Sequence, residues 1–155
     1  MTSAAPRRGI SPGAGLAALL VAECLVAVAM LALRQPEGVP SEARLKVVTG
    51  VGAIILAAAG SGWWLSQAAG RLSATRPAVA VAGGLAASLI RLAVPLLLLG
   101  WLQTADARAT LPAPLRTFLT ETLVTSYLVL LLVDILLQVA GTRRLRPTEP
   151  AVSDK

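Results

Sequence analysis

The stretch AVAVAGGLAASLIRLAVPLLLLGWL, residues 78–102, decides the fold of this chain. It is longer than the roughly 20 apolar residues that a helix needs to cross the hydrocarbon core of a bilayer. Its one charged residue, Arg91, lies near the middle. Because a guanidinium keeps its charge in proteins, placing it at this depth costs at least about 2.5–3.5 kcal/mol on insertion scales. The run therefore predicts a membrane-spanning helix whose arginine faces a partner or a water-filled cavity.

Apolar runs of similar length recur along the sequence and predict an all-α membrane protein with four transmembrane helices. The expected spans are residues 14–33, 47–67, 78–102 and 118–140, joined by short polar loops. Residues 1–13 form a polar tail before them, and residues 141–155 form a basic tail after them. Hydrophobic residues make up 55% of the chain and charged residues only 14%, which argues against a soluble domain of this length.

The distribution of Lys and Arg predicts the orientation of the chain. The two tails and the loop between the second and third spans hold eight of these residues, whereas the other two loops hold five. Because cytoplasmic segments are enriched in Lys and Arg, we expect both termini in the cytoplasm. Twelve of the fourteen cations are Arg, and Ala, Gly and Pro are abundant, as in proteins of GC-rich bacteria. The expected location is thus the bacterial cytoplasmic (inner) membrane.

The residue content argues against an enzyme. The sequence has no His and a single Cys, Cys24, which we expect to be a buried, inert thiol. It contains no nucleophile elbow, phosphate-binding loop, dinucleotide-binding glycine motif, zinc-ligand spacing or calcium loop. We therefore expect no catalytic residue, no cofactor and no metal site. The net charge of +6 comes from cations that flank the apolar runs, so it predicts membrane topology and lipid contact rather than nucleic-acid binding.

Depth in the membrane predicts which carboxylate neutralises Arg91. At 1.5 Å per residue, Glu23 and Arg91 lie about 15 and 20 Å from the cytoplasmic ends of their spans, and Asp134 lies about 9 Å from its own. This ranks Glu23 first and Asp134 second as the counter-ion, and places Glu121 in the opposite headgroup region. Alternatively, Arg91 has no partner outside the protein, and an internal Arg–Glu ion pair only stabilises the bundle.

The third span also has a face built for close helix contact. Gly84, Ser88, Arg91 and Pro95 recur at helical spacing, and small residues let helices approach closely, so Gly84 and Ser88 predict a packing groove. Pro95 has no N–H to donate to the carbonyl of Arg91, so we expect a kink there.

Two further patterns involve the second and fourth spans. Thr120, Tyr127, Asp134 and Gln138 predict a polar stripe that either lines a narrow ion path or forms interhelical hydrogen bonds. The second span is dense in glycine, which predicts packing close to the backbone, and ends in Trp63–Trp64, which we expect to anchor at the interface.

The segments SLIRLAVPLLLLGWL (88–102) and FLTETLVTSYLVLLLVDILL (118–137) resemble the second half of ATP synthase protein I (AtpI-like) proteins, small four-span bacterial membrane proteins encoded with the F-type ATP synthase. The matching positions are Arg91, Pro95 and Asp134. The resemblance implies an accessory role in assembling or stabilising the ring of c subunits, which makes these subunits the expected partners. A role in divalent-cation supply has also been proposed for the family.

Two alternative functions stay open at this point. One is a small oligomeric transporter or channel for Mg²⁺ or another cation, in which Glu23 and Asp134 act as ligands. The positive charge of Arg91 beside them counts against conduction of a divalent cation. The other is a generic membrane scaffold whose basic tail contacts anionic lipid headgroups.

Overall fold

The computed structural model describes residues 11–72 and 75–143, which form five helices and no strand. The helices are α1 (Pro12–Leu33), α2 (Ser41–Leu72), α3 (Pro77–Leu102), α4 (Ala105–Thr110) and α5 (Ala113–Arg143). Most of the two tails expected from the sequence, residues 1–10 and 144–155, lies outside the described residues.

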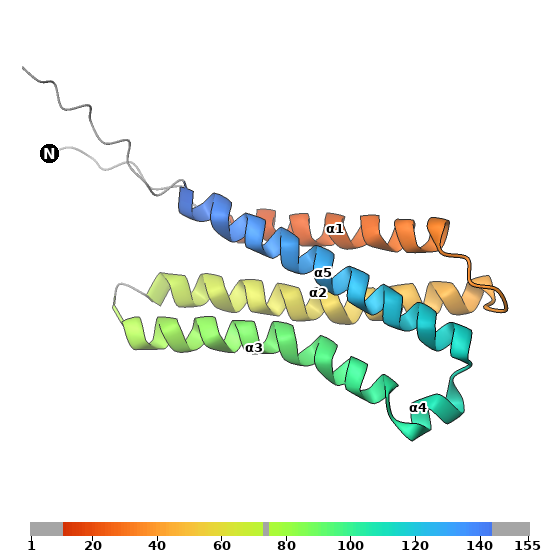
Figure 1. Cartoon of the computed structure of the whole chain (residues 1–155). Coiled ribbons are helices and arrows are strands. Elements are labelled where there is room, and N and C mark those ends of the chain that lie inside the picture. The colour runs from red at the N-terminus through yellow and green to blue at the C-terminus, as the bar shows by residue number, and fades with distance from the viewer. Residues whose placement is uncertain (1–10, 73–74, 144–155) are drawn as a thin grey trace, which may run out of the picture.

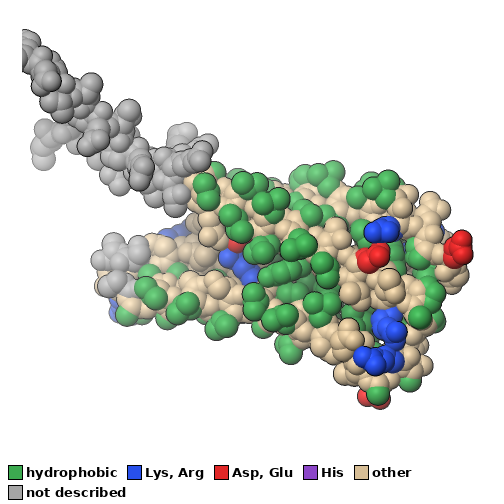
Figure 2. Space-filling model, in the orientation of Figure 1, with side chains coloured by type: hydrophobic (Ala, Val, Ile, Leu, Met, Phe, Trp, Pro, Cys, Tyr) green, Lys and Arg blue, Asp and Glu red, His purple; other side chains and the backbone are tan. Residues whose placement is uncertain are grey.

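Four of these helices, α1, α2, α3 and α5, are long and apolar enough to cross a membrane. This confirms the prediction of an all-α protein with four membrane-spanning helices, and the chain is a multi-pass membrane protein. The start of α1 and the end of α5 lie at the same end of the bundle, as an even number of spans requires (Figure 1). Hydrophobic side chains cover most of the middle of the face in Figure 2, where lipid would contact the helices.

The helices are longer than the apolar runs because hydrogen bonding continues into polar sequence. α2 begins at Ser41, and an ion pair of 2.7 Å between Glu42 and Lys46 spans its first turns. The short helix α4 was not predicted from the sequence. Its N-cap is Thr104, whose hydroxyl accepts a hydrogen bond of 3.3 Å from the backbone N–H of Ala107.

The second long helix is the centre of the bundle. α2 packs against α1, α3 and α5, and α5 crosses it obliquely (Figure 1). α3 lies chiefly along α2 and bends in its second half, where Pro95 interrupts the backbone hydrogen bonding. The bend lies in the half of α3 that contains Pro95, and the kink at this residue itself stays a prediction. The interface between α3 and α5 is smaller than the interface of α2 with either of them.

Buried side chains from α1, α2 and α5 form the core. One cluster includes Leu19, Ile55, Leu123 and Leu130, and a second cluster toward the other end includes Val26, Val48 and Phe118. Because three helices converge there, the polar side chains of Glu23, Thr122 and Ser126 are also buried, away from both lipid and water.

The two tryptophans of α2 have different positions. Trp64 is exposed, as an interfacial anchor would be, but Trp63 is only 2% exposed. The indole of Trp63 lies over Gly15 of α1 and donates a hydrogen bond of 3.1 Å to the carbonyl of Pro12. The prediction that both residues are anchors is therefore wrong for Trp63, which joins α2 to the start of α1. The two differ because adjacent helical positions face different directions. Which of them faces α1 depends on how the helices pack, and a single sequence does not show this.

Candidate functional site: the intramembrane charges

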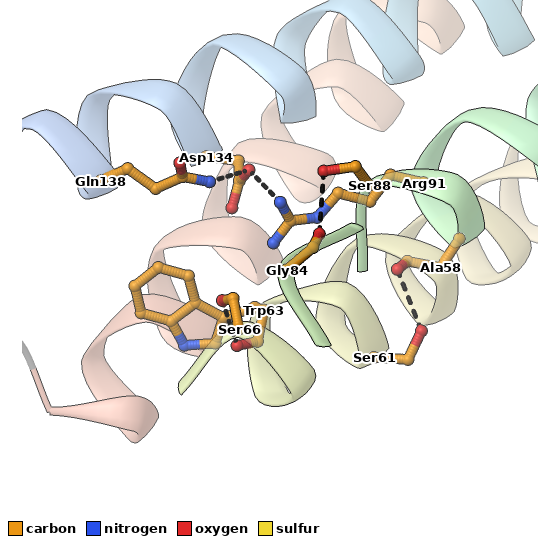
Figure 3. Close-up of polar contacts among 9 residues, drawn as sticks. All are labelled: Ala58, Ser61, Trp63, Ser66, Gly84, Ser88, Arg91, Asp134 and Gln138. Atoms are coloured by element: carbon orange, nitrogen blue, oxygen red, sulfur yellow. Dashed lines mark hydrogen bonds and ion pairs between the residues drawn. The ribbon is translucent and has the colours of Figure 1, made fainter. Parts of the chain in front are cut away.

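Arg91 of α3 forms an ion pair with Asp134 of α5. The distance from Nη1 to Oδ2 is 2.8 Å, and the two side chains are 13% and 5% exposed (Figure 3). The same Oδ2 atom accepts a hydrogen bond of 2.8 Å from the amide of Gln138, one turn further along α5. The pair thus joins the two long helices that otherwise share a small interface.

The depth ranking that placed Glu23 ahead of Asp134 as the counter-ion of Arg91 is wrong. It measured depth from the end of the apolar run, but α5 continues to Arg143, so Asp134 lies about 14 Å inside its helix at 1.5 Å per residue. Depth along a helix also does not show which helices are neighbours in the bundle. Glu23 lies on α1, which packs chiefly against α2 and α5 rather than against α3.

A glycine of α2 makes room for the arginine. A Cβ atom at Gly62 would lie 2.5 Å from Nε, 2.9 Å from Cγ and 3.1 Å from Cδ of Arg91. These atoms belong to the middle of the side chain, so they cannot move aside without moving the guanidinium. The glycine-rich sequence of the second span therefore serves, at this position, to let the arginine side chain cross α2.

Two donors of the guanidinium are used by none of the residues that the structure describes. Nε and Nη2 of Arg91 are buried and have no hydrogen-bond partner, and the same is true of Oδ1 of Asp134. Both residues line a cavity of about 20 Å³ together with Ala58 and Tyr127. A cavity of this size holds about one water molecule, which needs roughly 10–15 Å³. The accessible lining of this cavity is apolar, so the three unpaired atoms are buried beside it rather than open into it.

A second buried carboxylate lies in a different part of the bundle. Glu23 of α1 is 7% exposed, and its Oε1 accepts a hydrogen bond of 3.1 Å from the hydroxyl of Ser126 on α5. A Cβ atom at Gly52 of α2 would lie 2.5 Å from the same Oε1. Three helices thus enclose this carboxyl group, and its Oε2 has no hydrogen-bond partner.

Glu121 pairs with Arg34, which follows α1. The distance from Nε to Oε2 is 3.5 Å, and the side chains are 61% exposed for the arginine and 39% for the glutamate. This exposed pair lies where α1 ends, away from Arg91. Cys24 is exposed on the surface of α1, so the expectation of a buried thiol is wrong.

The groove expected at Gly84 and Ser88 takes no part in the packing of this bundle. Gly84 has open space where a Cβ would lie, and Ser88 is exposed and donates a hydrogen bond of 3.1 Å to the Gly84 carbonyl (Figure 3). The glycine of α3 that approaches α2 is Gly83, where a Cβ would lie 2.8 Å from that of Ala69. An open Gly84–Ser88 surface is available to another helix, and its use by a partner stays a prediction.

Ser126 and the two glycines of α2 were not singled out as site residues from the sequence. Buried residues of α5 recur every four positions, through Phe118, Thr122, Ser126, Leu130 and Asp134, and Leu123 is buried beside them. The predicted stripe was placed partly on a neighbouring face. Its Thr120 hydroxyl bonds to its own helix, at 2.9 Å from the carbonyl of Arg116.

Comparison with known proteins adds no assignment. The chain matches no protein-family model, and no significant match was found among curated proteins or among solved structures.

Proposed function

We propose that the protein is an accessory membrane protein of the bacterial inner membrane, with both termini in the cytoplasm, and that it assists assembly or stability of the c-ring of the F-type ATP synthase. In this proposal Arg91 binds the intramembrane carboxylate of a c subunit. The observation that supports it is the pair of unused donors, Nε and Nη2, on a guanidinium whose Nη1 is already bound to Asp134. The resemblance of residues 88–102 and 118–137 to ATP synthase protein I supplies the identity of the partner.

The geometry of the guanidinium supports a carboxylate as the ligand. The Nε–H and Nη2–H bonds are parallel and lie on one edge of the planar group, which is the edge that binds a carboxylate in a bidentate manner. Asp134 uses the remaining nitrogen, so it can stay bound while a second carboxylate occupies the free edge. An arginine between two carboxylates would donate hydrogen bonds to both, and the cluster of three groups would carry a net charge of −1.

Binding at this edge requires the bundle to open. The cavity of about 20 Å³ has room for a water molecule but not for a carboxyl group, and the free donors are shielded. The side that opens is the interface between α3 and α5, because it is small. The uncovered Gly84–Ser88 surface on α3 would then receive the partner helix.

The test is co-purification of c subunits with the protein from membranes that express both. Arg91→Lys keeps the positive charge but removes the bidentate edge, and Arg91→Gln removes both. Arg71→Gln is the matched control, because Arg71 is an exposed arginine in the last turn of α2. We expect recovery of c subunits to fall roughly tenfold or more in both Arg91 variants, since losing a buried charge pair costs about 2–5 kcal/mol.

Two results would overturn the proposal. One is normal recovery of c subunits and normal ring assembly with Arg91→Gln, which would make the arginine a purely internal element. The other is cation flux into liposomes that contain the purified protein alone, lost in Asp134→Asn, which would favour the transporter.

A further inference from the structure

Glu23 is buried without a positive charge beside it. Among the described residues no ion pair includes Glu23, and its single side-chain hydrogen bond comes from Ser126. It lies at the midpoint of α1, so neither end of the helix brings it near a lipid headgroup. An ionised carboxylate in such surroundings would be strongly disfavoured, because it loses its hydration and gains no counter-ion.

The residues that surround this position are uncharged on every helix that packs there. On α2 the buried residues near Gly52 are Val48, Val51 and Ile55, and on α5 those near Ser126 are Thr122 and Leu123. The Thr122 hydroxyl is already bound to the carbonyl of Phe118 at 2.8 Å. The closest charged residues along the three helices are Lys46, Glu121 and Arg34, and the last two are bound to each other.

The two oxygens of Glu23 have different surroundings. Oε1 accepts from Ser126 and lies in the space left by the missing side chain of Gly52, whereas Oε2 is fully buried and has no partner. An ionised Glu23 would bury a charged oxygen without a donor or a counter-ion, whereas a neutral carboxylic acid leaves only an uncharged polar group unpaired, at a smaller cost.

We propose that Glu23, Ser126 and Gly52 form a proton-binding site in the membrane, in which Glu23 is a neutral carboxylic acid. The inference does not rest on the proposed function. Glu23 and Arg91 lie on helices that do not pack against each other to any great extent, so the site would persist if no c subunit bound the protein.

The carboxyl group of Asp134 allows a comparison with that of Glu23 within the same bundle. Asp134 is buried to a similar degree, but it has Arg91 at 2.8 Å and Gln138 at 2.8 Å on the same oxygen. Partners of this kind stabilise an anion. One buried carboxyl group is thus a neutral acid and the other an ion, although both lie in apolar surroundings.

Infrared spectroscopy of the purified protein in lipid at neutral pH tests the proton directly. A carboxylic acid has a carbonyl stretching band that a carboxylate lacks. We expect this band in the wild-type protein, its loss in Glu23→Gln and its retention in Asp134→Asn. The substitution by Gln preserves shape and neutrality, and its carbonyl oxygen still accepts from Ser126. The Glu23→Gln variant should therefore fold, with a melting temperature within about 3 °C of the wild type.

Modification by dicyclohexylcarbodiimide supplies the chemical test. The carboxylic acid transfers its proton to a carbodiimide nitrogen, its oxygen adds to the central carbon, and the adduct rearranges to a stable N-acylurea. Nothing leaves, so the chain gains the mass of one whole carbodiimide. The experiment uses a Cys24→Ser background, because the exposed thiol also reacts with carbodiimides. We expect the adduct on the peptide containing Glu23 and none on the peptide containing Asp134.

Each outcome decides the inference. Absence of the acid band at neutral pH would overturn it, as would loss of the band in Asp134→Asn rather than in Glu23→Gln. If Na⁺ at constant pH abolishes the band, the site binds a metal cation in place of a proton, and the proposal is wrong in that respect. An adduct that forms equally on Glu23 and Asp134 would contradict the distinction between the two carboxyl groups.

Discussion

Gly62 of α2 lies directly beneath the side chain of Arg91 on α3, so that a Cβ at this glycine would fall 2.5 Å from the arginine Nε. The position of the charge in the membrane therefore depends on a residue of a different helix that has no polar group. The arginine, its counter-ion Asp134 and this glycine come from three helices, which makes the site a property of the assembled bundle rather than of α3 alone.

Gly62→Ala is expected to destabilise the bundle through this contact. The added methyl group would force the middle of the Arg91 side chain to move and lengthen its ion pair with Asp134. We expect a loss of about 1–3 kcal/mol, as for other overpacked interiors. The measurement is the free energy of unfolding in mixed micelles.

Gly50→Ala is the matched control for that substitution. Gly50 lies on the same helix, is exposed and has open space where a Cβ would be. Since alanine favours a helix over glycine by about 0.5–1 kcal/mol, this variant should be as stable as the wild type or more so. Equal stability of the two alanine variants would show that the Arg91 side chain adapts freely.

Removing one member of the Arg91–Asp134 pair should cost more than removing both. Asp134→Leu or Arg91→Met alone leaves an uncompensated buried charge, for which we expect a loss of about 3–5 kcal/mol. The double variant has no charge to solvate in lipid, so it should regain most of this stability. A double-mutant cycle on unfolding free energies measures the coupling, and additive effects of the two changes would contradict the pairing.

The sequence was sufficient for the number of spans but not for the pairing of charges. Hydropathy located the four membrane helices because each apolar run has bilayer length. Depth along a helix could not select between Glu23 and Asp134, because which helices are neighbours depends on packing. The predicted polar stripe of α5 shares only Asp134 with its buried face, because polar residues occur on several faces of this helix and only packing decides which face is buried.

The tryptophans allow a test of the packing of α2 on α1. Trp63→Phe removes the indole N–H that bonds to the Pro12 carbonyl and leaves a smaller ring over Gly15. We expect a loss of about 1–2 kcal/mol from the hydrogen bond and the reduced packing. Trp64→Phe is the matched control, because Trp64 is 63% exposed. If Trp64→Phe destabilised the protein more, the roles of the two residues would be reversed.

Gly52→Ala, which affects Glu23, should lower the free energy of unfolding less than Gly62→Ala, which affects Arg91. The atom that the new methyl group would meet is Oε1, at the far end of a flexible side chain, at 2.5 Å. The carboxyl group can rotate away, but it then loses the hydrogen bond from Ser126, so we expect a cost of about 1 kcal/mol. The same substitution in a Glu23→Ala background removes the conflict and should be neutral or stabilising. Unfolding free energies of the four proteins measure this difference. A cost of Gly52→Ala that persists without the glutamate would mean that the glycine is needed for contact between the helix backbones instead.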